Sequence, residues 1–345
     1  MADMPDWARA HGEPLFTGRI RERPQDFIVD EELGFAPSGD GEHDLLRIRK
    51  TSANTAWVAR QLAAFAGIPA RDVGYCGLKD RHAVTSQWFS VRRIGTNDWD
   101  AFEASGVEVI EVLAHRKKLR RGSHRGNAFR IALRPTADVP PVPVVEERLK
   151  AVERHGVPNY FGEQRFGRGG SNIALAERLF AGQRMKRDKR SIALSAARSF
   201  LFNAILDRRV RDGSWDAALP GELVNLDGSR SVFSAGEEDL ADRLSALDVH
   251  PTASLWGRGA PLADDVARAL EREIVGEFPA LVEGLEQAGV DAGHRPTRVR
   301  VQDLEWSASD NVLAVTFTLP SGAFATSVLR EIATVVDAQT VSSST

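Results

Sequence analysis

The segment GYCGLKDRHA at residues 74–83 places one carboxylate, Asp80, directly between two cations, Lys79 and Arg81. Nearby positive charge favours the ionised form of a carboxyl group. An anionic carboxylate in a pocket that excludes water can act as a nucleophile or as a general base. The same residues are also typical of an exposed turn, so the pattern alone leaves both interpretations open.

The motifs of several other kinds of active site are absent from the sequence. There is no GxxxxGK[ST] phosphate loop, and FGRGGSN at residues 166–172 lacks the glycine spacing of a dinucleotide site. The eight histidines form no HExxH pair, and the single cysteine, Cys76, excludes an internal disulfide and a cysteine-based zinc cage. There is no GxSxG motif either. An enzyme with this sequence is therefore expected to work without a metal, a cofactor or a reactive thiol.

Positive charge is concentrated in two parts of a chain whose net charge is only −3. Residues 112–137 contain no acidic residue but many arginines and lysines, and RMKRDKR at 184–190 forms a second basic island. Acidic residues collect elsewhere, as at 236–242 and 271–277. Such clustering is typical of proteins that bind a phosphate backbone. Solvated loops and helix faces are the alternative explanation for each island.

The length of 345 residues predicts about two domains, each with its own core. No apolar run approaches the roughly 18 residues of a membrane span, so no membrane partner is expected. The N-terminal residues lack the pattern of a secretory signal. We therefore expect a cytoplasmic protein, with a monomer as the default oligomeric state.

Alternating and β-branched residues predict the strands that would position Asp80. They fall at 26–33, 43–50, 83–91, 107–113 and 127–134, with a helix at 54–65 capped by Asn54. Asp80 then lies in a glycine-containing loop that precedes the strand at 83–91, a common location for functional residues.

The rest of the chain changes character twice. A proline-rich linker at 135–144 precedes a mainly helical region that extends to about residue 290, interrupted by a short β segment at 222–235. Strands return at 297–306 and 311–320 around a turn at 307–311, and a last helix is predicted at 323–336. This order predicts an α+β domain built from both ends of the chain, with a mainly helical domain inserted into it.

Six segments of the sequence resemble signature blocks of the D family of tRNA pseudouridine synthases. They span most of the chain, in order: RIRERPQDFIVDEELGF (19–35), GLKDRHAVTSQWFSV (77–91), GNAFRIALR (126–134), VPNYFGEQRFGRGGSN (157–172), SAARSFLFNAIL (195–206) and LPSGAFATSVLREI (319–332). The resemblance implies the pseudouridine synthase fold, with a mixed, mainly antiparallel sheet flanked by helices. It also implies a catalytic domain at 1–156 and 296–345 and an inserted TRUD domain of α/β type at 157–295.

The resemblance also implies roles for particular residues. Asp80 would be the nucleophile, and Phe27 would stack on or pack against the target uracil. Asn127 would hydrogen-bond the base, and Phe324 would complete its pocket. Taken alone, both phenylalanines are typical of a core and the asparagine is typical of a turn.

Three further residues are candidates near the base. Phe129 would occupy the place that a tyrosine takes in other pseudouridine synthase families. Arg21 is the candidate cation for pairing with Asp80, and Lys79 is a second candidate that the sequence does not exclude.

The resemblance implies an isomerase that detaches uracil from ribose, turns it and rejoins it through C5. The substrate would be tRNA, the usual target of the family is uridine 13 in the dihydrouridine arm, and no cofactor is needed. Attack at C1′, attack at C6 and abstraction of the 2′ proton all remain open. The rival hypotheses are a non-catalytic RNA-binding or RNA-chaperone protein that uses the same basic cleft, and a hydrolase for a small substrate.

Overall fold

A computed structural model describes residues 4–137, 140–235, 240–309 and 311–339. The chain folds into two compact units, which we call unit 1 and unit 2. Unit 1 comprises Met1–Pro14, Glu146–Val301 and Ala323–Ile332, and unit 2 comprises Leu15–Val145, Gln302–Gly322 and Ala333–Thr345. These bounds differ from the predicted domain limits, and the predicted domain division stays a prediction.

Unit 2 is built on a ten-stranded sheet with the central order β14-β15-β7-β2-β5-β3-β6. The β2–β5 and β1–β16 pairs are parallel and the other pairs are antiparallel, so the sheet is mixed but mainly antiparallel. Its strands are β1 (Thr17–Ile20), β2 (Phe27–Leu33), β3 (His43–Thr51), β4 (Val73–Tyr75), β5 (Val84–Arg92), β6 (Val107–His115), β7 (His124–Pro135), β14 (Gln302–Ser309), β15 (Val312–Pro320) and β16 (Thr334–Asp337).

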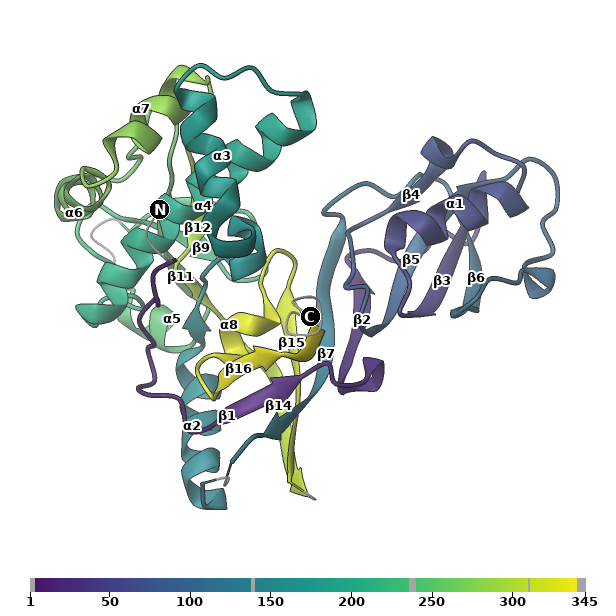
Figure 1. Ribbon diagram of the computed structural model, residues 1–345, viewed down its shortest axis with the longest axis horizontal. Coiled ribbons are helices and arrows are strands. Elements are labelled where there is room, and N and C mark those ends of the chain that lie inside the picture. The colour runs from purple at the N-terminus through teal and green to yellow at the C-terminus, as the bar shows by residue number, and fades with distance from the viewer. Residues whose placement is uncertain (1–3, 138–139, 236–239, 310, 340–345) are drawn as a thin grey trace. The chain divides into compact units, whose positions relative to one another are not determined.

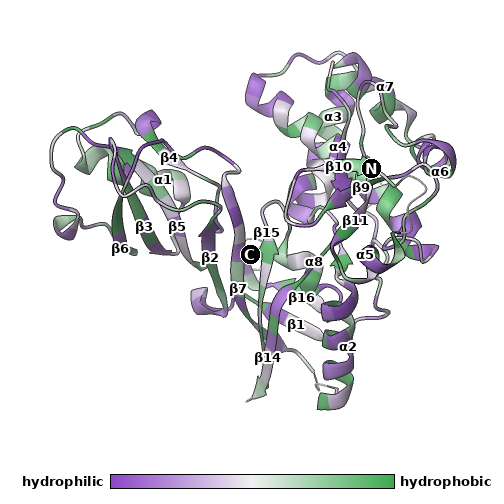
Figure 2. Ribbon diagram, turned by 180° about the vertical axis from the view of Figure 1, so that it is seen from behind, coloured by the Kyte–Doolittle hydropathy of each residue, from purple (hydrophilic) through white to green (hydrophobic). Residues whose placement is uncertain are grey.

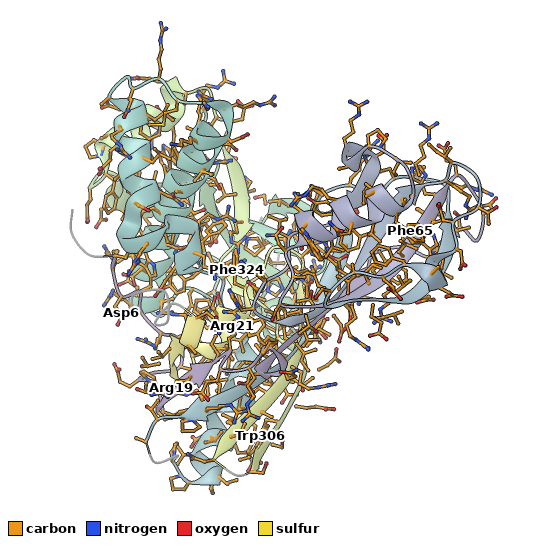
Figure 3. The ribbon with its side chains drawn as sticks, turned by 45° about the vertical axis from the view of Figure 1, so that its right-hand side comes forward. Asp6, Arg19, Arg21, Phe65, Trp306 and Phe324 are labelled. Atoms are coloured by element: carbon orange, nitrogen blue, oxygen red, sulfur yellow. The ribbon has the colours of Figure 1, made fainter. Side chains whose placement is uncertain are left out.

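Helix α1 (Thr55–Phe65) packs against β3 and β5 of this sheet (Figure 1). Its N-terminus is capped as predicted, because the Asn54 side chain accepts hydrogen bonds from the backbone N–H groups of Ala56 and Trp57. At its other end Phe65 packs against Trp99 (Figure 3). This small core fixes one end of the sheet and, through Thr55, reaches the loop that carries Asp80.

Unit 1 packs helices around a small sheet of order β10-β9-β11-β12. The long α4 (Arg187–Arg211) is its central helix, because Leu201, Phe202 and Ile205 are all fully buried. Its other elements are α2 (Val142–His155), which begins in unit 2, α3 (Ser171–Phe180), α5 (Ala241–Ser245), α6 (Asp265–Val275), α7 (Pro279–Gln287), α8 (Ala325–Leu329), β8 (Val157–Pro158), β9 (Leu223–Leu226), β10 (Val232–Ser234), β11 (Val249–Leu255), β12 (Gly293–Pro296) and β13 (Arg298–Val299).

Hydrophobic periodicity explains most of these elements. Hydrophobic and hydrophilic segments alternate along α2 (Figure 2), where Val145, Leu149 and Val152 are buried. No helix of the described ranges is long and apolar enough to cross a membrane.

Four predictions about elements were wrong. The last helix ends at Leu329 instead of 336, because residues 334–337 pair with β1 as the strand β16. The residues before about 290 predict one long polar helix that ends near Gln287, but the structure has two helices there, α6 and α7. Strand β11 was missed inside the helical region. The predicted turn at 307–311 was also wrong for residues 307–309, which belong to β14, and residue 310 is outside the described residues.

Candidate active site

Residues 76–83 form the loop between β4 and β5, and several polar side chains hold it in place. The Thr55 hydroxyl accepts a hydrogen bond from the backbone N–H of Lys79 at 3.1 Å and donates one to Gln87 at 2.9 Å. The ammonium of Lys50, whose residue is fully buried, donates to the backbone carbonyl of Asp80 at 2.8 Å. The backbone around Asp80 is therefore fixed from below by groups of β3, α1 and β5.

The carboxylate of Asp80 is paired with Arg21. A guanidinium N–H of Arg21 (Nη2) lies 3.1 Å from Asp80 Oδ2. The Asp80 side chain is 39% exposed, whereas that of Arg21 is only 7% exposed. One side of the carboxylate is thus held by a buried cation and the other side remains accessible from outside the protein.

Arg21 is itself held by two side-chain contacts and by an unusual backbone conformation. Its Nη1 donates to Asp337 at 2.6 Å, and its guanidinium lies 3.9 Å from the centre of the Phe27 ring. Its backbone has φ = +58°, a conformation that non-glycine residues rarely adopt. Such strain is common where a side chain must point in one particular direction. The turn after β1 therefore aims Arg21 at Asp80.

Lys79 is the second cation of the site, but it does not contact the Asp80 carboxylate. Its ammonium lies 2.7 Å from Glu31 and donates to the amide oxygen of Asn127 at 2.6 Å. An ammonium group only donates, which fixes the oxygen of Asn127 toward Lys79 and leaves the NH₂ group on the other side. The cation left open by the sequence is therefore Arg21, and Lys79 orients Asn127.

Phe27 and Phe129 lie beneath this polar layer. Phe27 is 2% exposed and Phe129 is 8% exposed, and their rings meet edge to face with centroids 6.3 Å apart. Phe129 also contacts Phe317 of β15. Arg21 covers one face of the Phe27 ring, so that face is closed to direct stacking on a base. In this arrangement Phe27 supports Arg21, and its predicted contact with uracil stays a prediction.

Phe324 belongs to unit 1, whereas the other predicted site residues belong to unit 2. It is half-buried at the start of α8, in extended backbone conformation, and its ring lies 6.1 Å from that of Phe161. Phe324 is labelled in Figure 3. Its predicted place in a base pocket stays a prediction.

Three residues of this site were not anticipated from the sequence: Lys50, Asp337 and Glu31. Burial lowers the pKa of the Lys50 ammonium to about 8. The Glu31 side chain is fully enclosed; it accepts a hydrogen bond from the Trp88 backbone N–H at 3.1 Å and forms an ion pair with Lys79. A charged residue at an inward position of a strand is a signal that could have marked Lys50 and Glu31. Asp337 gave no such signal, because its segment was predicted as a helix.

Together these residues form a small site over the central strands β7, β2 and β5, with an accessible carboxylate, a buried cation and an oriented amide. This arrangement can present an anionic oxygen to an electrophilic carbon or to a proton, while the amide donates to an acceptor on the same ligand. The site and the mixed sheet below it define an α+β protein with an accessible, ion-paired carboxylate.

Comparison with known proteins places the chain in a family. The family model described as tRNA pseudouridine synthase D (TruD) matches residues 9–183 and 179–332. The chain is 48% identical to the tRNA pseudouridine synthase D of Methylococcus capsulatus, over 95% of this chain and 94% of that protein. It is 45% identical to the protein of the same name from Aeromonas hydrophila, over 94% and 93%. The chain belongs to the tRNA pseudouridine synthase D family.

A solved structure supports the fold. The chain is similar to a crystal structure from Methanosarcina mazei that carries the same family name, with a TM-score of 0.73, 20% identity and 96% coverage of both chains. At this identity the likeness concerns the fold alone. The fold is thus the predicted pseudouridine synthase fold, an α+β architecture with a mixed sheet.

Proposed function

We propose that this protein is a tRNA pseudouridine synthase that isomerises uridine 13 of the dihydrouridine arm, with Asp80 as its nucleophile. Relatives that share 45–48% of their residues over nearly the whole chain are named as tRNA pseudouridine synthases, which supports the reaction class. The observation that carries the role of Asp80 is its accessible carboxylate, held 3.1 Å from the buried guanidinium of Arg21.

The reaction requires a carboxylate that is charged and fixed in direction. The hydrogen bond from Arg21 restricts the rotation of the Asp80 carboxylate, and Lys50 fixes the backbone of the same residue. The geometry is compatible with attack at C1′ or C6 and with abstraction of the 2′ proton. In every case the developing charge would lie beside Arg21, which can stabilise it without moving.

Asn127 would select the base. Since Lys79 occupies its amide oxygen, Asn127 presents N–H donors, which suit the carbonyl oxygens of uracil. Cytosine carries an amino group in place of O4, so a donor at that edge would face a donor. Such a buried mismatch costs about 1–3 kcal/mol.

The cations of residues 112–137 would contact phosphates of the tRNA. Within the described residues, six of them are exposed and form no ion pair: Lys117, Lys118, Arg120, Arg121, Arg125 and Arg130. The island at 184–190 contributes Arg184, Lys186 and Lys189 to the lining of a cavity of about 330 Å³ in unit 1. Contacts of this kind position an RNA without selecting its sequence.

The test compares Asp80→Asn with Asp72→Asn, a control that removes a carboxylate from the chain segment just before β4. Because pseudouridine has the same mass as uridine, tRNA incubated with each protein would be labelled with a carbodiimide that remains attached to pseudouridine, and position 13 would be mapped by the added mass. Asp80→Asn is expected to lower turnover by about 10⁴-fold or more, with tRNA affinity within a few-fold of wild type, and Asp72→Asn should behave as wild type. Turnover of Asp80→Asn near the wild-type value would overturn the nucleophile, and product at another uridine would overturn the position.

A further inference from the structure

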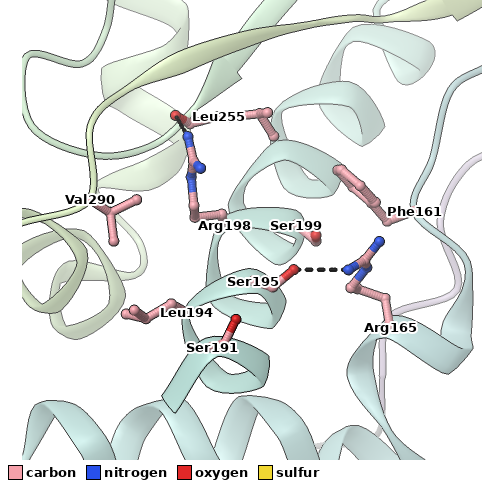
Figure 4. A pocket seen from close by; sticks show the side chains of 9 residues that line it. All are labelled: Phe161, Arg165, Ser191, Leu194, Ser195, Arg198, Ser199, Leu255 and Val290. Carbon is pink, nitrogen blue, oxygen red and sulfur yellow. Dashed lines mark hydrogen bonds between the residues drawn. The ribbon is translucent and has the colours of Figure 1, made fainter. Parts of the chain in front are cut away.

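Unit 1 contains a cavity of about 310 Å³ whose lining combines cations, hydroxyls and apolar side chains (Figure 4). This volume is at the lower end of the range of small-molecule sites and leaves room for more than a bare anion. All of its lining residues belong to unit 1, so the cavity is a feature of that unit by itself. It is lined by Phe161, Arg165, Ser191, Leu194, Ser195, Arg198, Ser199, Leu255 and Val290.

Two arginines give the cavity its positive charge. The Nη1 of Arg165 donates to the Ser195 hydroxyl at 2.9 Å, and Arg198 donates to the backbone carbonyls of Leu255, Trp256 and Asp291 at 3.0–3.1 Å. Neither guanidinium has a carboxylate within ion-pair distance in the part of the chain that the structure describes. Partly buried charges in proteins are ordinarily paired, whereas here the carboxylate of Asp291 attracts Arg198 only from beyond ion-pair distance.

The electrostatic surroundings agree with this view. Burial lowers the pKa of Arg165 and that of Arg198, because each guanidinium is partly removed from water. Arg295 adds a third positive charge, since its guanidinium lies 4.0 Å from the centre of the Phe161 ring and is repelled by Arg165. An anionic ligand would relieve both the repulsion and the cost of burial.

Helix α4, which carries Arg198, also supplies hydroxyls to the cavity, and part of the remaining lining is apolar. Ser191, Ser195 and Ser199 are spaced four residues apart on α4, so their side chains lie on one face of that helix (Figure 4). Leu255 and Val290 line the same cavity. A serine face of this kind also occurs where helices pack closely, but here an open cavity covers it. The combination suits a group that has oxygens at one end and a flat apolar ring at the other.

We propose that this cavity binds one unpaired nucleotide of the RNA substrate, with its phosphate on Arg165, Arg198 and the serine hydroxyls and its base against the apolar wall. Arginine forms paired hydrogen bonds to phosphate oxygens, and serine hydroxyls add further donors. The identity of the RNA rests on the proposed function. Unit 1 would thereby bind the tRNA at a nucleotide other than the one that reacts.

The first test measures the dissociation constant of tRNA at fixed salt for Arg165→Gln. The control is Arg272→Gln, which removes the same charge from an exposed position on α6, outside the cavity and outside both basic islands. Loss of a charge-assisted contact is expected to weaken binding about tenfold or more for Arg165→Gln, while Arg272→Gln changes it by less than about threefold. Ser191→Phe, which fills the cavity without changing charge, should weaken binding as Arg165→Gln does.

The second test distinguishes a nucleotide from a free phosphate ion. At constant ionic strength, uridine 5′-monophosphate should compete with tRNA at about tenfold lower concentration than inorganic phosphate does, and this advantage should vanish in Arg165→Gln. Equal competition by the two compounds would overturn the nucleotide assignment. Equal tRNA affinities of Arg165→Gln and Arg272→Gln would overturn the site.

Pseudouridine formation by the same preparations separates this inference from the proposed function. If the wild-type protein forms pseudouridine and Arg165→Gln binds tRNA as Arg272→Gln does, only the cavity inference fails. If the wild-type protein forms no pseudouridine in tRNA, the proposed function fails first.

Discussion

Each unit contains a buried arginine that is paired with a carboxylate, and the two arrangements differ in what they leave open. In unit 1, Arg209 lies 2.6 Å from Glu222, and the side chains are only 3% and 1% exposed. In unit 2, Arg21 is equally buried, but its partner Asp80 is 39% exposed. The arginines are alike; the carboxylates are not.

The unit 1 pair has no capacity for a ligand. Arg209 also donates to the carbonyls of Ser214 and Ala217, and Glu222 accepts from the backbone N–H groups of Leu219 and Thr252. All three guanidinium nitrogens of Arg209 and both carboxylate oxygens of Glu222 thus form hydrogen bonds within the protein. Such a pair joins the end of α4 to β9 and β11, and the difference suggests that accessibility of the carboxylate separates a reactive pair from a structural one.

The largest effect on stability is expected for Arg209→Met, which leaves Glu222 buried without its cation. We expect the free energy of unfolding to fall by about 3–5 kcal/mol, measured by urea denaturation. The control Arg208→Met, at the neighbouring exposed position, should change it by less than about 1 kcal/mol. A loss below 1 kcal/mol for Arg209→Met would show that the unit 1 pair is not structural.

Arg21→Met should affect turnover strongly and stability less than Arg209→Met does. We expect turnover of tRNA to fall by about 10²–10³-fold, because the charge beside Asp80 is lost. The free energy of unfolding should fall less than in Arg209→Met, because Asp80 and Asp337 keep contact with water. The control is Arg19→Met, on the exposed side of β1. If Arg21→Met lowered the free energy of unfolding as much as Arg209→Met does, the two pairs would not differ in their structural role.

Glu271, a buried carboxyl group near the Arg209–Glu222 pair of unit 1, should make the stability of the protein depend on pH. Burial, as the largest cause, and the nearby Glu222 raise its pKa from 4.5 to about 7. Between these two values the folded state binds a proton that the unfolded state has released, so this group makes stability fall as pH rises from about 4.5 to about 7.

We therefore expect Glu271→Gln to remove a decline of up to about 3 kcal/mol between pH 4.5 and 7. Urea denaturation at several pH values measures it, with the exposed Glu273→Gln as control. An unchanged pH profile in Glu271→Gln would contradict this account of the buried carboxyl.

The smallest effect is expected for Lys50→Met. The Asp80 carbonyl loses its donor, so turnover should fall about tenfold, with kcat affected more than KM. The free energy of unfolding should not fall, because burying the Lys50 charge is unfavourable in the folded state. Arg49→Met, at the exposed neighbouring position of β3, is the control. Loss of stability without loss of turnover would make Lys50 a structural residue.

The sequence predicts the location of Asp80 well and the contacts around it poorly. The loop, the adjoining strands and the Asn54 cap follow from local patterns, since each depends on neighbours within a few residues. Phe27 and Asn127 were singled out through family resemblance. In the structure Phe27 contacts Arg21, and Asn127 contacts Lys79.

The contacts that were missed are long-range ones. Residues 334–337 (TVVD) are too few for periodicity to distinguish a strand from the end of a helix. Their conformation is decided by pairing with β1, and Arg21 and Asp337 are 316 residues apart in the chain. Likewise, the role of Lys50 follows only from the folded structure, in which its ammonium donates to the backbone carbonyl of Asp80.

The parallel pairing of β1 with β16 has a consequence for folding. Closing so large a loop is entropically costly, and contacts between such distant segments tend to form late. Until β16 docks, Arg21 lacks one of its two anchors. On dilution from denaturant, secondary structure and much of the sheet should therefore form before catalytic activity returns. The delay between the two would measure how slowly β16 pairs with β1.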